Sequence, residues 1–383
     1  MSAFWLAWRY IRYHRGRTAI LIAAISLTMF LPLATRWMIA SFQAKAMDRA
    51  SRTPLVVGTK GSRFAVALHS LYFRGESPTP MKYAEVERLR AFNLAELIPL
   101  HSRFRTRDHA IVGTIPAYFS NRQLVLSSGE PMSRYGDCVV GASAAKRLAA
   151  KPGDSLLSES ENLFDLSGAA PLRMRVTGIL EESGTADDDV VFCELETAWI
   201  MEGIGHGHAL KNDESGEHTH EASRQNLSQH QEVTAENLRS FHFHGSKSEY
   251  PITAIIAVPD SDRSATLLQG KYLEADQQYQ IIRPLDVIDE LMQVVGRVRG
   301  LFDIGMIGLA IITCLLVALV LLLSLRLRQR EMRTMFLLGC NRGRIAQIVG
   351  AELAIVVLTS VAVALIAASL LTTTAESLML RLL

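Results

Sequence analysis

Three long uncharged runs constrain this chain more than any other feature of its 383 residues. They lie between Arg17 and Arg36 (18 residues), between Asp303 and Arg326 (22 residues) and from Leu353 to Ala375 (23 residues). In a helix that rises about 1.5 Å per residue, 18 residues reach about 27 Å, close to the hydrocarbon thickness of about 30 Å. Core helices of soluble domains seldom hold more than about 14 wholly apolar residues. The sequence therefore predicts three membrane-spanning helices, over residues 18–40, 301–325 and 346–372.

The first run has an alternative reading as a cleaved signal peptide. Arg9, Arg12, Arg15 and Arg17 precede it, and Ala44-Lys45-Ala46 resembles a cleavage site. The run is longer than the usual hydrophobic region of a signal peptide, and this site lies beyond Arg36. We therefore favour a retained spanning helix.

The distribution of arginine predicts the orientation. Against a single Glu331, six arginines follow the second span: Arg326, Arg328, Arg330, Arg333, Arg342 and Arg344. The positive-inside bias places residues 1–17 and 326–345 in the cytoplasm. Residues 41–300 and the tail 373–383 then lie outside. We expect a multi-pass protein of the cell (inner) membrane with a large extracytoplasmic domain. A net charge of +2 without a basic patch among aromatics argues against a nucleic-acid partner.

The extracytoplasmic segment has the pattern of a mixed α/β domain on helical stalks. Short apolar runs bounded by Gly, Pro or Asp predict strands, at Leu55–Gly58, Ala110–Gly113, Cys138–Gly141, Arg173–Ile179, Val190–Cys193 and Thr253–Val258. Helical patterns lie between them, at Lys82–Phe92, Ala142–Ala149, Leu195–Met201 and Ser261–Ala275. Alternation of this kind favours one α/β domain, with two lobes as an option.

Two stalks are expected to join this domain to the membrane. One is Trp37–Arg52, which ends before Pro54. The other carries an apolar stripe at three- and four-residue steps, formed by Ile288, Leu291, Met292, Val295, Val298 and Phe302. We expect these two stalks to pack together beneath the outer domain.

A polar, histidine-rich loop interrupts the domain at residues 203–245. It contains seven of the 11 histidines and three His-x-His pairs, at His206/His208, His218/His220 and His242/His244. Imidazole is a common zinc ligand, and a flexible loop can wrap an ion. The alternative is a polar insertion with no metal role. The sequence leaves both open.

Cysteine usage allows one disulfide. Cys314 falls in a predicted span and Cys340 in the cytoplasmic loop, whereas Cys138 and Cys193 share the outer compartment. Only that pair can meet in an oxidising environment.

The cytoplasmic loop predicts a short amphipathic helix over Arg328–Leu338, ended by Gly339. Met332, Met335 and Phe336 can then face the bilayer or a partner while the arginines face water. The simpler alternative is a basic loop that only fixes topology.

This loop resembles the segment R-R-R-E-I-x-x-L-R-A-L-G-A-x-R-x-x-I-x-x-x-x-x-x-E of MacB/FtsX-like ABC transporter permeases (the LolC/MacB-like, type VII group). The candidate ATPase-coupling residues are Arg328, Arg330, Glu331, Arg333, Met335, Leu338, Gly339, Arg342 and Glu352. Outer segments resemble a branch of the same permeases, at Val56–Pro80, Ile111–Phe119, Val139–Asp154 and Val176–Trp199.

The resemblance implies a permease subunit that forms a homodimer, or a heterodimer with a related permease. Its coupling helix would dock on a cytoplasmic ABC ATPase, whose ATP hydrolysis would move the outer domain for export, extraction or uptake of cargo, metal-related cargo included. Such permeases normally have four spans and this sequence predicts three, which leaves open a truncated product, a split gene with a separate fourth helix, or a three-span protein. The chain has no phosphate-binding G-x-x-x-x-G-K-[ST] loop, so ATP must act through the partner. We expect no cofactor of its own, zinc at the histidine-rich loop excepted.

Catalysis has little support in the sequence. No nucleophile and base stand at a defining spacing beside His69, His101 or His109. The acidic run Asp187–Asp189 is more typical of a turn between strands than of a cation site. The second functional hypothesis is therefore a membrane-anchored metal-binding or sensory protein that never couples to ATP.

Overall fold

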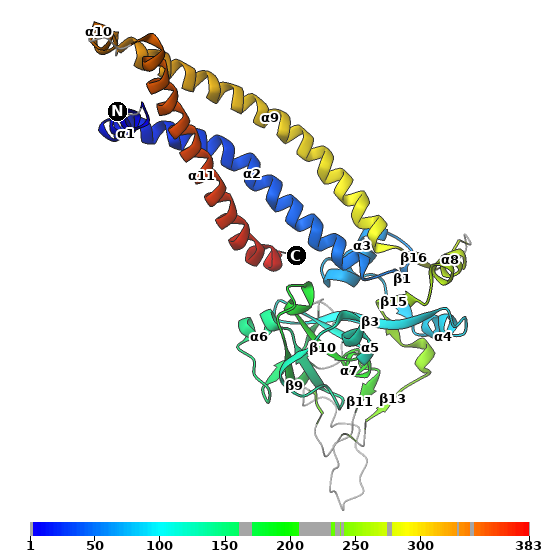
Figure 1. Cartoon of the computed structure of the whole chain (residues 1–383). Helices are drawn as coiled ribbons and strands as arrows, with labels where there is room; N and C mark the ends of the chain where they lie inside the picture. The colour runs from blue at the N-terminus through cyan, green and yellow to red at the C-terminus, as the bar shows by residue number, and fades with distance from the viewer. Residues whose placement is uncertain are drawn as a thin grey trace, which may run out of the picture. The chain divides into compact units, whose positions relative to one another are not determined.

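The computed structural model describes residues 3–160, 171–206, 231–233, 238, 241–273, 278–327, 329–337 and 341–382. Its internal contacts divide it into two units. The first, which we call the membrane unit, is Met1–Lys45 with Leu291–Leu382, and the second, the outer unit, is Ala46–Glu290. Two helices, α2 and α9, run unbroken from one unit into the other (Figure 1).

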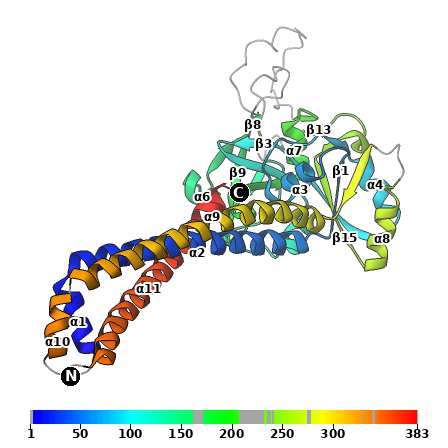
Figure 2. The same ribbon diagram turned by 90° about the horizontal axis from the view of Figure 1, so that it is seen from above.

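The membrane unit consists of helices: α1 (Ala3–Tyr13), α2 (Arg15–Ser51), α9 (Pro284–Leu327), α10 (Gln329–Leu337) and α11 (Arg342–Leu382). Within the described residues, three helices are long and apolar enough to cross a membrane, over Arg15–Ser51, Pro284–Val320 and Gly343–Leu371. The prediction of three apolar spanning helices is confirmed. Figures 1 and 2 both show α1 and α10 at the same end of the long helices.

Polar contacts join the three spanning helices to one another. Ser26 of α2 donates its hydroxyl to the Ser360 carbonyl of α11 at 3.1 Å, and the hydroxyls of Thr28 and Thr313 lie 3.0 Å apart. Arg36 also pairs with Asp303 of α9 at 3.2 Å. Because lipid tails give helices no hydrophobic reason to associate, such hydrogen bonds are a typical source of specificity between spans.

The predicted stalk stripe of α9 is only partly buried. Ile288 and Met292 are 3% and 7% exposed, whereas Val298 and Phe302 are 49% and 67% exposed. Val295 lies between these limits, as partly buried, and packing of the whole stripe against the other stalk stays a prediction. An apolar face that is open in one chain can still be covered by lipid.

The outer unit is built on a sheet with the strand order β12-β9-β6-β10-β4-β3-β15-β1-β16; β5 and β7 pair with β9, and β8 pairs with β3. The strands are β1 (Leu55–Thr59), β3 (Ala95–Thr106), β4 (His109–Thr114), β5 (Leu126–Gly129), β6 (Asp137–Val140), β7 (Ser155–Leu157), β8 (Glu159–Ser160), β9 (Leu172–Leu180), β10 (Val190–Glu194), β12 (Gln231–Glu232), β15 (Ala254–Pro259) and β16 (Tyr279–Ile282). Two short ladders lie apart from it, β11 (Gly205–His206) with β13 (His242–Phe243), and β2 (Met81–Lys82) with β14 (Pro251–Ile252).

Helices of the outer unit are short. They are α3 (Arg63–Tyr72), α4 (Ala84–Arg90), α5 (Pro116–Arg122), α6 (Ala142–Leu148), α7 (Leu195–Met201) and α8 (Asp262–Gly270), with 3-10 turns η1 (Ala186–Asp189) and η4 (Lys247–Glu249). Three of the six, α3, α5 and α6, end after two or three turns at a C-cap residue in the left-handed region. For example, Ser62 accepts the Ala65 amide at the start of α3, and Phe73 ends that helix in the left-handed region with φ 54°.

One strand, β3, joins the two halves of the sheet. Its first half, Ala95–Leu100, pairs with β15, and its second half pairs with β4 after a register shift between His101 and Phe104. Each half has its own apolar core, one around Trp199 and Ile255 and the other around Ile111 and Met174. The register shift is typical of a β-bulge, and the one sheet thus carries two apolar cores. The predicted mixed α/β fold is confirmed.

Candidate functional site

The predicted coupling segment forms helix α10, close to its expected bounds. Arg330, Glu331, Arg333 and Met335 lie in it, Arg342 begins α11, and Arg328, Leu338 and Gly339 fall outside the described residues. Among the described side chains of α10, Arg333 is exposed, and Phe336 and Leu337 are 52% and 79% exposed. Exposed apolar side chains next to a cation are typical of a helix that binds a protein partner or lies at a membrane interface.

Glu352, the acidic residue of the coupling set, is buried between helices. Its Oε1 lies 3.3 Å from a guanidinium nitrogen of Arg17, and its side chain is only 10% exposed. Arg17 stands in the first turns of α2 and also lies over the Tyr10 ring of α1. Acidic groups within spans are expensive unless paired. This pair therefore fixes α11 against α2 near the end that carries α10.

The other end of α2 is held by a buried ion pair in the outer unit. Arg49, in the last turn of α2, donates to both carboxylate oxygens of Asp187 at 2.7 and 3.0 Å. A third donor, its Nε, hydrogen-bonds the Leu71 carbonyl of α3. The two side chains are 6% and 2% exposed. A bidentate pair of this kind fixes orientation as well as distance.

Neighbouring groups complete this anchor. The Tyr118 hydroxyl donates to Asp187 at 2.7 Å, and Arg122 donates to the Thr53 hydroxyl just beyond α2 at 2.7 Å. Burial alone would raise the pKa of Asp187, but the charges of Arg49 and Arg122 and the hydrogen bonds from Arg49 and Tyr118 lower it to about 2. The carboxylate is thus charged at any physiological pH.

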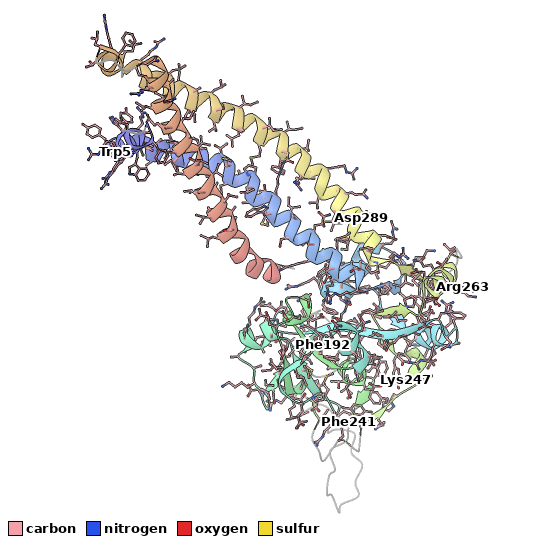
Figure 3. The ribbon with its side chains drawn as sticks, in the orientation of Figure 1. Trp5, Phe192, Phe241, Lys247, Arg263 and Asp289 are labelled. Carbon is pink, nitrogen blue, oxygen red and sulfur yellow. The ribbon has the colours of Figure 1, made fainter. Side chains whose placement is uncertain are left out.

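An aromatic cluster supports the anchor from the outer unit. The Phe192 ring of β10 lies 5.5 Å from Tyr118, 5.3 Å from Phe119 and 6.4 Å from Phe73. Figure 3 shows Phe192 well inside the outer unit. Rings at these separations pack with specific geometry. These packed rings therefore hold the Tyr118 side chain in the orientation in which its hydroxyl contacts Asp187.

Each aspartate of the run Asp187–Asp189 has a different structural role. Asp188 accepts the amides of Ser183 and Gly184 at 2.9 and 2.8 Å and so closes the preceding turn. Asp189 lies 2.8 Å from Arg74 and 3.1 Å from Arg147, with His109 Nδ1 at 2.9 Å. Together with the Arg49–Asp187 pair, these contacts support the structural reading of the run as an acidic turn.

The histidine-rich loop is described only at its ends. Backbone pairing of β11 with β13 puts His206 opposite His242, and the His242 and His244 rings lie 4.8 Å apart. His208, His218 and His220 lie outside the described residues. The part of the chain that the structure describes holds no group of three His, Cys, Asp or Glu arranged for a metal ion.

The family model described as the MacB-like periplasmic core domain matches residues 18–224. That range covers more than half of the chain. The chain belongs to this family. It is a MacB/FtsX-like ABC transporter permease, a membrane protein with an extracytoplasmic domain, as the loop motif and outer segments predicted.

Solved structures similar to this MacB-like permease include two isolated domains. The periplasmic region of MacB from Actinobacillus actinomycetemcomitans matches with 12% identity and a TM-score of 0.34, over 63% of this chain and 92% of that one. The extracellular domain of the noncanonic ABC-type transporter YknZ from Gram-positive bacteria matches with 9% identity and a TM-score of 0.33, over 60% and 98%. No curated protein matches the chain.

Sequence reasoning about this MacB-like permease missed Arg49 and understated Asp187. In the structure, Ala46 and Ala50 of the same helix are buried with Arg49, at 4% and 1% exposed. The partner carboxylate lies 138 residues away, a pairing that one sequence cannot reveal.

Proposed function

We propose that the chain is a permease subunit that couples ATP hydrolysis in a partner ATPase to movement of its outer unit. The proposal rests chiefly on one observation, the unbroken helix α2 (Arg15–Ser51) with an ion pair close to each end. A helix transmits displacement along its axis through its ladder of backbone hydrogen bonds, of which Pro32 removes one in α2 because proline has no N–H. Pulling or turning α2 would therefore act directly on Asp187.

At the inner end, α10 would receive the signal from the ATPase. Arg333, Phe336 and Leu337 offer the partner a cation beside two open apolar side chains. The helix is short and directly precedes α11, whose Glu352 holds Arg17 of α2. A shift of α10 would thus reach α2 through a chain of contacts in the membrane unit, and α2 would carry it outward. The family resemblance adds dimerisation of the permease on two ATPase subunits.

Charge reversal in α10 tests this function. We expect an R330E/R333E variant to lose at least about tenfold in recovery of the partner ATPase by affinity purification, because two favourable contacts across a docking surface become repulsive. The variant should still insert, which protease protection of the outer unit in spheroplasts measures. Recovery of the ATPase at the wild-type level would overturn the coupling role.

A matched control separates docking from membrane topology. An R9E/R12E variant removes the same charge from the same predicted side of the membrane, but from α1. It should retain the ATPase. Equal loss in both variants would mean that positive charge alone, and not α10, governs recovery.

A second candidate function, zinc binding by the histidine-rich loop, is favoured by the ladder that sets His206 opposite His242. Directly opposed residues are the nearest cross-strand neighbours in an antiparallel pair. We expect calorimetric titration of the detergent-solubilised chain with zinc to show a site that H206A/H242A weakens at least about tenfold and deletion of residues 206–244 abolishes, whereas H14A leaves it unchanged. Identical titrations for the wild type and the deletion would remove this function.

A further inference from the structure

Two buried cysteines face each other across neighbouring strands of the outer unit. Cys138 of β6 is the register partner of Cys193 of β10 in an antiparallel pair. Side chains of directly opposed residues point to the same face of a sheet. Both cysteines accordingly belong to the same apolar core, together with Val140 and Val191.

The hydrogen-bond pattern fixes which kind of pair this is. The Gly141 amide donates to the Val190 carbonyl at 2.8 Å, and the register places these two residues opposite each other. Hydrogen-bonded and non-hydrogen-bonded pairs alternate along an antiparallel ladder. Counting three positions from Gly141 and Val190 makes Cys138 and Cys193 a non-hydrogen-bonded pair. In such pairs the Cα atoms are about 4.5 Å apart and the side chains are close, within the range that a disulfide spans.

We infer that Cys138 and Cys193 form a disulfide in the extracytoplasmic domain. Two S–H bonds break and one S–S bond forms, and both electrons and both hydrogens pass to the disulfide of an oxidant, such as a disulfide-carrying oxidoreductase, which becomes a dithiol. The inference requires only that the outer unit lies in an oxidising compartment. It does not depend on ATP coupling.

The timing of the reaction follows from burial. Both cysteines are completely buried, and burial raises the pKa of each thiol. Because the thiolate is the reactive form, the folded pair would react slowly with any reagent. The bond therefore forms while β6 and β10 are still accessible, and afterwards the core protects it from reductants.

The bond would strengthen the platform that holds the α2 anchor. Strand β10 begins at Val190, directly after the Asp187–Asp189 turn, and Gly141 at the end of β6 abuts that turn closely. A Cβ on Gly141 would lie 2.3 Å from the Asp187 carbonyl oxygen. A covalent link between these strands prevents them from separating when α2 pulls on Asp187.

Thiol counting on the full chain in its native membrane tests the inference. Acid-trapped protein is denatured and alkylated before and after reduction, and the modified cysteines are identified by mass spectrometry. We expect Cys314 and Cys340 to react before reduction and all four cysteines to react after it. In a C138A variant Cys193 should react without reduction. Reaction of Cys138 and Cys193 in unreduced wild-type protein would overturn the inference.

Thermal unfolding gives an independent measurement. Breaking the bond during heating with a phosphine reductant should lower the unfolding midpoint of the wild-type outer unit by roughly 5–10 °C, because the unfolded chain gains freedom. A C138A/C193A variant should show no effect of the reductant. The reductant could leave the wild-type unfolding midpoint unchanged while both cysteines still fail to react with the alkylating reagent. That result would indicate another modification of the thiols and would also contradict the inference.

Discussion

Replacing Asp187 with alanine is expected to lower the free energy of unfolding of the outer unit by about 3–5 kcal/mol. The variant leaves the Arg49 guanidinium buried without its carboxylate, and the Tyr118 hydroxyl loses its acceptor. Urea unfolding of the solubilised chain, followed through the buried Trp199 in the core of the outer unit, measures the change. A D108A variant removes an exposed aspartate and should change stability by no more than about 0.5 kcal/mol.

The double variant R49M/D187L separates stability from transmission. Apolar replacement of both partners of a buried ion pair often restores stability, since neither charge remains to be desolvated. We expect most of the loss in D187A to be recovered. The proposed relay through α2 should nevertheless be weaker, so ATP should no longer alter amide hydrogen exchange in β10 of the permease–ATPase complex. If D187A costs no more than D108A, the pair does not anchor α2.

Acidification is expected to destabilise the outer unit through His69. Burial lowers the pKa of His69 to about 4, helped by the nearby charges of His101 and Arg105 and only partly opposed by its hydrogen bond to the Ser102 carbonyl. Its Nε2 donates to that carbonyl at 3.0 Å, and its buried Nδ1 has no hydrogen-bond partner. A proton added to Nδ1 would thus be buried without an acceptor.

The sign and the pH window follow from linkage. The folded pKa is lower than the ordinary value of 6.5, so the unfolded chain binds the proton first. Stability is complete above about pH 6.5 and is lost as the pH falls toward 4, by about 2 kcal/mol at pH 5. Comparison with H69Q, which keeps an amide donor for Ser102, isolates this contribution in urea unfolding at pH 7.5 and pH 5. Parallel losses in both proteins would exclude His69 as the source.

The strands that sequence reasoning found share a simple local pattern. Strands β4, β6, β10 and β15 are apolar runs that end at a helix start or a turn, and all were predicted within one or two residues. The longest strand, β3, was missed. It contains Pro99, which normally argues against a central strand, and its buried run does not alternate because both faces are covered.

The two ends of the proposed relay differed in how far they could be predicted from the sequence. The coupling helix is a local, charged and amphipathic pattern, so its existence could be predicted from Arg328 to Leu338 alone. The anchor depends on a register of contacts among Arg49, Tyr118 and Asp187, which three separate elements bring together. Such long-range partners follow from tertiary packing, which propensity and periodicity do not encode.

Three identical neighbours in the acidic turn are under three different constraints. Asp188 uses both of its carboxylate oxygens to accept backbone amides, which asparagine, with a single side-chain oxygen, cannot reproduce. Asp187 must supply a negative charge to a buried guanidinium, whereas Asp189 balances partly exposed cations. Inserting or deleting one residue in this turn would move each aspartate away from the partner that it now contacts. The order of the residues in this turn is therefore constrained as tightly as their charges.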